Sequence, residues 1–135
     1  MPILVKRLGP GKDIYSELKA LVEEQKLGAA VVLSLVGSLK VGSLRYAGQE
    51  NASKLEGPLE IVSATGTLGL SGMHVHISVS DSNGRTTGGH LMPGNLVYTT
   101  CEIVLHDFSK EWKFERVLDL STGYPELVGV SLHLK

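Results

Sequence analysis

GMHVHISVSDSNGRTTGGHLMPG, residues 72–94, is the stretch that decides how the middle of this chain folds. Polar and apolar residues alternate through its first half, which predicts a half-buried β-strand. Because side chains two apart share one face of a strand, His74 and His76 point the same way, while Val75 and Ile77 point the other. Residues 81–84, Asp-Ser-Asn-Gly, predict a turn. We therefore expect a β-hairpin with histidines on one face.

The turn residues also predict the register of this hairpin. A three-residue loop ending in a left-handed Gly84 pairs Asp81 with Arg85 and His76 with His90. A two-residue Asn-Gly loop would shift the pairing by one residue and send His90 to the apolar face. The apolar pattern selects the first register, because it keeps all hydrophobic side chains on one face. His74, His76 and His90 are then expected to meet on one patch.

Composition limits the class of protein. The 135 residues are 42% hydrophobic and 20% charged, which indicates one globular domain over residues 1–135. The formal charge of −1 gives no overall attraction to nucleic acid. A single cysteine, Cys101, excludes an intramolecular disulfide and favours a reducing, cytoplasmic location. Residues 1–8 are too short and too charged for a signal peptide, and no apolar run reaches membrane-spanning length.

The rest of the chain predicts one helix and further strands. Asp13 is a good N-cap for an amphipathic helix that we expect to end at Gly28. Residues 48–58 are polar and are interpreted mostly as a loop. The other predicted strands are residues 3–8, 29–33, 41–47, 59–70, 96–108 and 113–120. The expected fold is α+β, a mainly antiparallel sheet of about seven strands with the helix on one face.

Several motifs together carry a family resemblance. They include Val36-Gly37-Ser38-Leu39, His74-Val75-His76-Ile77-Ser78, Gly88-Gly89-His90-Leu91 and Thr122-Gly123-Tyr124. The chain resembles the plant and prokaryote conserved (PPC) domain, which is also found beside AT-hook motifs in plants. The resemblance covers nearly the whole chain and is to the prokaryotic-type branch. It implies a homotrimer with a divalent metal, zinc, held by His74, His76 and His90.

The same resemblance implies a DNA-binding or transcription-associated role, because the family carries a DNA-binding label. The sequence lacks the Arg-Gly-Arg-Pro AT-hook and any Lys/Arg-rich arm, to which DNA contact is attributed in the plant branch. A local basic face would have to be built from Lys6, Arg7, Lys40 and Arg45. DNA is therefore the alternative partner, and self-association the expected one.

The histidines have a metal-binding interpretation and a simpler one. Neutral imidazole is a common zinc ligand, and three such ligands leave a position open, as in catalytic sites. A metal-dependent hydrolase is therefore a further alternative, although no catalytic residue can be named from the sequence. The simpler interpretation is that the histidines are polar residues on a hydrated sheet face or at a subunit interface. Imidazole also suits copper, nickel and iron.

Five other residues have both a functional and a structural interpretation. Glu102 could orient a ligating histidine or act as a base, although a surface or interface salt bridge is favoured. Cys101 is expected to be a small buried hydrophobe. Arg85 is expected to form a salt bridge with Asp81 across the turn. Gly88 and Gly89 are expected to make room for packing.

Sequence reasoning favours self-association over a monomer. The predicted apolar strands outnumber what a single helix can cover, and an uncovered sheet must be paired or protected. Residues 29–36 in particular have the continuous apolar character of a strand that is covered on both faces. The preferred function is thus a homotrimeric metal-binding domain with a ligand-binding or regulatory role.

Overall fold

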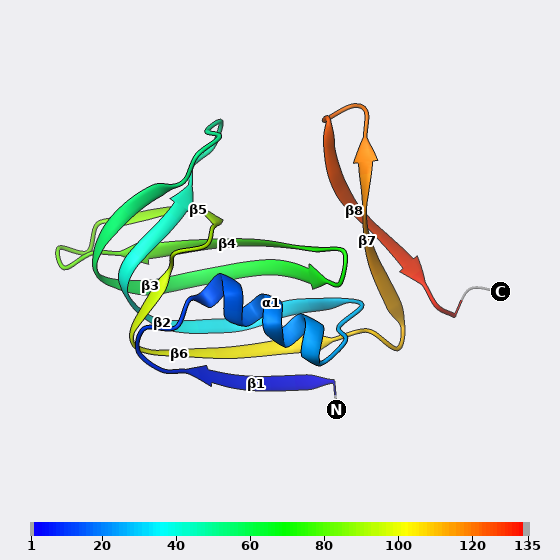
Figure 1. Cartoon of the computed structure of the whole chain (residues 1–135), viewed down its shortest axis with the longest axis horizontal. Coiled ribbons are helices and arrows are strands. Elements are labelled where there is room, and N and C mark those ends of the chain that lie inside the picture. Colours follow the sequence, from blue (N-terminus) through cyan, green and yellow to red (C-terminus); the bar gives the residue numbers. More distant parts are fainter. Residues whose placement is uncertain (1, 134–135) are drawn as a thin grey trace.

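A computed structural model describes residues 2–133 and contains one helix and eight strands in that part of the chain. Figure 1 shows a curved sheet with the helix across it and a separate hairpin at one end. The elements in chain order are β1 (Ile3–Leu8), α1 (Ile14–Glu24), β2 (Ala30–Arg45), β3 (Ser53–Gly69), β4 (Gly72–Ser80), β5 (Thr86–Leu91), β6 (Leu96–Asp107), β7 (Trp112–Asp119) and β8 (Tyr124–Ser131).

Six strands form an antiparallel sheet in the order β1-β6-β2-β3-β4-β5. The far end of β2 also pairs with β5, where Leu44 lies opposite Leu91 and Arg45 opposite His90. Strands β2 to β5 therefore close into a ring of pairings. A Cβ on Gly89 would lie 2.8 Å from the carbonyl oxygen of Arg45, so only glycine lets β5 approach β2 here. This confirms that Gly89 makes room for packing.

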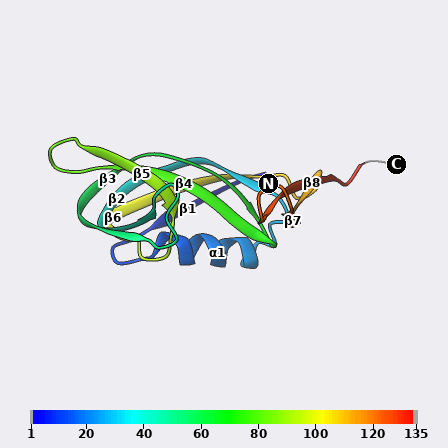
Figure 2. The same cartoon turned by 90° about the horizontal axis from the view of Figure 1, so that it is seen from above.

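The helix covers one face of the sheet (Figure 2). Asp13 caps it by accepting a hydrogen bond from the backbone N–H of Tyr15, and Ile14, Leu18 and Val22 are buried beneath it. The helix ends at Glu24 rather than at the expected Gly28. Lys26 adopts a positive φ of 52°, which turns the chain and sends Leu27 into the core.

The sequence prediction divided one long strand into two and placed the start of another strand in a loop. The two predicted strands 29–33 and 41–47 are parts of one long strand, β2, and most of the predicted loop 48–58 belongs to β3. Shifts in register interrupt the pairing of β2, for example between Leu39 and Val41. The strand bends at these irregularities and continues. Gly37 and Gly42 lie within this strand, and the pairing with β6 shifts directly after Gly37, which agrees with the expectation that these glycines permit bends or bulges.

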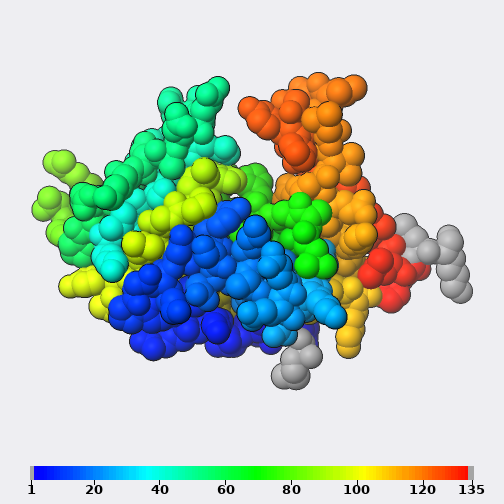
Figure 3. Space-filling view, in the orientation of Figure 1, coloured from blue at the N-terminus to red at the C-terminus, as the bar shows by residue number. Residues whose placement is uncertain are grey.

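The β7–β8 hairpin stands apart from the body of the molecule, as the space-filling view shows (Figure 3). Its second strand was not predicted. At its base, the backbone N–H of Phe114 donates to the carbonyl of Gly28 at 2.8 Å, and Arg116 Nη2 donates to Thr67 Oγ1 at 2.9 Å. Beyond that base the hairpin carries exposed apolar side chains on both strands. They are Val117, Leu118, Tyr124, Leu127 and Val128.

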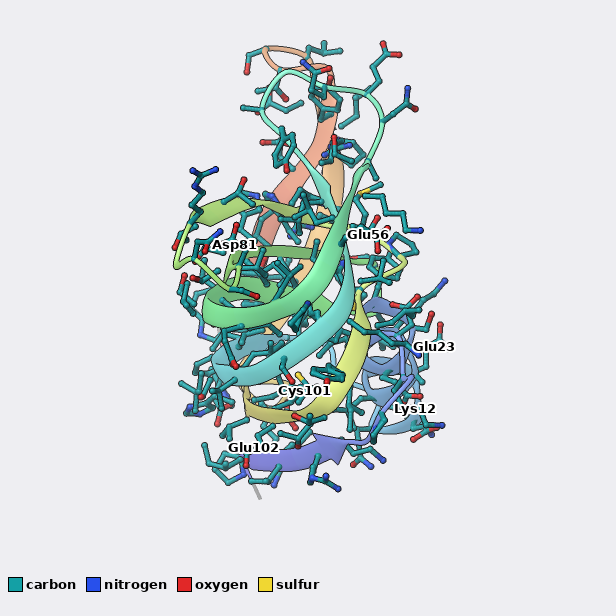
Figure 4. All side chains as sticks on the ribbon, turned by 90° about the vertical axis from the view of Figure 1, so that its left-hand side faces the viewer. Lys12, Glu23, Glu56, Asp81, Cys101 and Glu102 are labelled. Atoms are coloured by element: carbon teal, nitrogen blue, oxygen red, sulfur yellow. The ribbon has the colours of Figure 1, made fainter. Side chains whose placement is uncertain are left out.

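Cys101 lies on the core side of β6 and has no exposed surface (Figure 4). Burial, and secondly the charge of Glu102, raise the pKa of its thiol to about 12. The expectation of a small buried hydrophobe is confirmed. A thiol with this pKa is almost entirely protonated at neutral pH and is a poor nucleophile.

We therefore predict that Cys101 is inert in the native protein. Incubation with a disulfide reagent such as DTNB at pH 8 should release less than about a tenth of an equivalent of thiol per chain, because both access and ionisation are lacking. The same protein in guanidinium chloride should release one equivalent. Rapid, stoichiometric labelling of the folded protein would contradict a buried Cys101.

Candidate metal centre

The β4–β5 hairpin has the register expected from its turn. His76 lies opposite His90, and the backbone N–H of Asp81 donates to the carbonyl of Arg85 at 2.9 Å. Gly84 has a φ of +78°, the left-handed conformation that closes a three-residue loop. Since the register is correct, His74, His76 and His90 share the exposed face, as predicted.

The turn is stabilised differently from the prediction. One carboxylate oxygen of Asp81 accepts hydrogen bonds from the backbone N–H groups of Asn83 at 2.9 Å and Arg85 at 3.0 Å. Within residues 2–133, no ion pair joins Asp81 to the Arg85 side chain. The expected salt bridge is therefore replaced by an Asx turn, which fixes the backbone directly.

The three imidazole rings form a compact cluster. Nε2 of His74 lies 3.0 Å from Nε2 of His76, and one ligand atom from each of the three rings lies within 4.8 Å of the others. The centroid of the His90 ring is 5.1 Å from that of His74 and 5.6 Å from that of His76. Two nitrogens on one tetrahedral zinc ion are about 3.3 Å apart. The three rings are therefore close enough for one ion to be considered between them, with His90 the most distant of the three.

The surroundings keep two of these histidines neutral. Burial, then the positive charge of Arg45 and the other two histidines, lower the pKa of His90 to about 4. Burial, then His76 and Arg116, also lower the pKa of His74. Metal ions bind the neutral imidazole, so at pH 7 these rings have lone pairs available for coordination without first losing a proton.

The histidines open onto a cleft of about 860 Å³. One wall is the β2–β3 connection, residues 46–50, and another is Tyr124 at the start of β8. The floor is formed by the histidines together with Gly88 and Gly89. Figure 3 shows the hollow between these two projections. The cluster is thus accessible to a small molecule as well as to an ion.

Other predicted residues lie away from this cluster. Glu102 is exposed beside β1, at the edge of the sheet opposite the hairpin that carries Asp81 (Figure 4). It therefore lies outside the histidine cluster of its own chain, and it joins no ion pair within residues 2–133, so the expected surface salt bridge is absent from a single chain. The interface salt bridge stays a prediction. His106 stacks on Phe108 at a centroid distance of 4.2 Å, and His133 is exposed, as expected for residues outside the site.

The four cations of the hypothetical basic face do not share a surface. Lys6 and Arg7 follow one another in β1, so their side chains point to opposite faces of the sheet. Arg7 is occupied locally, since its Nε donates to Thr100 Oγ1 at 2.9 Å. Arg45 borders the histidine cleft instead. The structure therefore provides no common basic face built from these residues.

Three further residues line the cleft and the hollow beside it, and none of them was predicted as a site residue. Arg45 lies opposite His90 across the β2–β5 pairing, Arg116 comes from β7, and Tyr124 begins β8. They come from segments far apart in the chain. Arg45 was considered only as a surface cation. The pairing that places it here joins strands more than 40 residues apart and has no local sequence signal.

The chain belongs to the Plants and Prokaryotes Conserved (PCC) domain family, whose model matches residues 1–109. This is the same family as the PPC domain that the sequence motifs resemble. The match includes every strand of the main sheet and all three histidines of the cluster. Within residues 2–133, the helix is too short to cross a membrane.

Two similar proteins differ in how much of their length matches this chain. The "Bifunctional protein GlmU" of Synechococcus sp. strain JA-2-3B'a(2-13) is 50% identical over 121 residues, which are 90% of this chain but only 19% of that protein. The chain thus spans about a fifth of the length of that relative. A hypothetical protein from Salmonella enterica has a solved structure with a TM-score of 0.93 and 42% identity, covering 96% of this chain and 94% of that one.

A less similar solved structure is that of a protein described as containing metal. The metal-containing protein AF0104 from Archaeoglobus fulgidus is 28% identical and superposes with a TM-score of 0.77. The comparison covers 93% of this chain and 92% of that one.

Proposed function

We propose that this domain binds one divalent transition metal ion, zinc, through His74, His76 and His90, and that the ion serves a ligand-binding or regulatory role. The observation that carries the proposal is the convergence of three imidazole ligand atoms within 4.8 Å. The lowered pKa of His90, about 4, supports it because the ring is ready to coordinate at neutral pH. The likeness to a metal-containing protein is consistent with it.

The donor set fits zinc in an open site. Three neutral nitrogens without a thiolate or carboxylate are typical of zinc sites that keep a coordination position for water or another ligand. Such an ion would supply a Lewis-acid centre at the floor of the cleft. The protein would supply orientation, because His76 and His90 are held opposite each other by strand pairing.

Metal analysis tests this proposal. We predict that tag-free protein, saturated with zinc and then desalted, retains about one zinc per chain, whereas His76→Ala retains less than about a tenth. Removal of one of three ligands leaves two, and two imidazoles hold zinc weakly. His106→Ala is the matched control, because this histidine stacks on Phe108 outside the cluster, and it should retain zinc like the wild type. Equal and negligible zinc in wild type and His76→Ala would end the proposal.

We also propose that the domain assembles as a homotrimer. Its support is the amount of apolar surface that one copy leaves uncovered. Val5 is 76% exposed, Leu33 53% and Val62 55%, and each alternates with core residues along its strand. These side chains lie on the sheet away from α1, and the β7–β8 hairpin adds a second apolar surface. Closed cyclic symmetry lets both surfaces be covered by identical copies.

DNA association and hydrolysis are the alternative functions. The family's DNA-binding label supports DNA association. The net charge of −1 and the placement of Lys6 and Arg7 on opposite faces of the sheet weigh against it, and we therefore prefer the metal-binding role. A fluorescence titration with duplex DNA at low salt separates them, since DNA contact requires salt-dependent affinity. The open cleft supports the hydrolase, which would require metal-dependent turnover of an ester or phosphoester.

A further inference from the structure

The cleft contains an arginine that belongs to no ion pair among residues 2–133. Arg45 is half-buried at the end of β2 and lies directly opposite His90. Side chains of directly opposed residues point to the same face, with Cβ atoms about 5 Å apart. Arg45 lines both the main cleft and an adjoining hollow of about 410 Å³. Its guanidinium is therefore held beside the histidines and within reach of the same small molecule.

A second arginine adds positive charge to the adjoining hollow. Arg116 lines this hollow, and its Nη2 donates to Thr67 Oγ1 at 2.9 Å, which fixes the guanidinium. Two carboxylates, those of Glu50 and Glu126, line the two hollows. They offset the arginines, and a bound dication would leave a clear positive excess.

From this arrangement we propose that the cleft binds a small oxyanion, a carboxylate or a phosphate group, with one oxygen on the metal ion and another on Arg45. The proposal rests on the metal site proposed above. A hard oxygen suits the open position of a three-histidine zinc site. The guanidinium of Arg45 offers charged N–H donors that suit a second oxygen of the same group. Arg45 therefore determines which class of ligand the metal retains.

The size and shape of the cleft suit a small metabolite. At about 860 Å³ its volume lies in the range of ordinary small-molecule pockets. Half-buried Tyr46 and exposed Tyr124 face it from opposite walls, and both offer a ring and a hydroxyl to the part of the ligand away from the oxyanion. Gly88 and Gly89 keep the floor free of side chains. The rest of the ligand thus has room beyond the anchored group.

Cobalt-substituted protein tests this proposal with a spectroscopic signal. Co²⁺ at three histidines absorbs in the visible range, and the spectrum changes when a new oxygen enters its coordination. We expect inorganic phosphate or malate to produce a saturable change at constant ionic strength, whereas neutral glycerol at the same concentration produces none. The anion that saturates at the lower concentration identifies phosphate or carboxylate as the preferred group, and either supports the proposal.

Variants at Arg45 assign the effect to this side chain. Arg45→Gln should retain cobalt but bind the preferred anion at least tenfold more weakly, and Arg45→Lys should fall between it and the wild type. Arg85→Gln is the matched control, because that exposed arginine lies at the β4–β5 turn, and it should bind like the wild type. An unchanged dissociation constant in Arg45→Gln would overturn the role of Arg45. Cobalt-loaded wild type that responds to neither anion would overturn the ligand class alone, whereas protein that retains no metal would overturn the metal site with it.

Discussion

Two glutamates on one face of the β7–β8 hairpin are expected to dissociate the proposed trimer into single chains. Leu118 is 61% exposed and Leu127 is 42% exposed. The pairing of Leu118 with Pro125 and of Arg116 with Leu127 places both leucines on the same face of the hairpin. In a trimer this face would lie against a neighbouring copy. An unpaired carboxylate buried there costs about 3 kcal/mol or more at each interface.

Light scattering after size exclusion measures this outcome. The wild type should have three times the 14.5 kDa mass of one chain, and Leu118→Glu/Leu127→Glu should have the mass of one chain. Lys19→Glu, on the outer side of α1, is the matched control because it also makes the net charge more negative by two, and it should remain trimeric. A wild type that is monomeric at micromolar concentration would contradict the trimer. A double variant that stays trimeric would place the interface elsewhere.

The structure of the β7–β8 hairpin is the reason for proposing that a second copy covers it. An isolated two-stranded hairpin is marginally stable in water. Here the base is held by the hydrogen bonds of Phe114 and Arg116, while Leu118 and Tyr124 nearer the tip are largely exposed. Tyr124 at this tip also lines the histidine cleft. Assembly, if it orders the hairpin, would therefore also shape the cleft in which the proposed ligand binds.

The predictable part of the site was local. The alternation from Met73 to Ser80 and the single turn at Gly84 were sufficient to pair His76 with His90, because strand register follows from the apolar pattern and the turn type. Arg45 was not identified as a site residue, since its place depends on β2 crossing to β5. That crossing depends on a bend within a 16-residue strand, and no local sequence feature indicates which strand the bent end meets.

Strand β8 and the end of helix α1 were also not predicted correctly from the sequence. Residues 124–131 form β8, yet nearly every side chain in it is exposed, so the alternation between buried and exposed positions that identifies a strand is absent. The helix ended early because Lys26 adopted a conformation that glycine usually takes.

Gly37→Ala is expected to be strongly destabilising. Gly37 lies in the middle of β2, opposite Cys101 of β6. A Cβ at this position would collide with the carbonyl oxygen of Thr100 and lie 2.7 Å from the Cα of Cys101. Both are backbone atoms of a central strand, so no side-chain rotation can relieve the contact. The two strands must separate, which we expect to cost about 3 kcal/mol or more of unfolding free energy.

Urea unfolding followed by circular dichroism measures this loss, with Gly9→Ala as the control. Gly9 has open space around its Cβ position, and alanine there should change stability by no more than about 0.5 kcal/mol. Cys101 provides an independent readout, because separation of β2 from β6 opens the strand on which the thiol is buried. Native-state labelling of Cys101 should therefore accelerate in Gly37→Ala and stay slow in Gly9→Ala. If both variants unfold at the same urea concentration and label equally slowly, the close approach of these two strands is wrong, and with it the bend that places Arg45 beside His90.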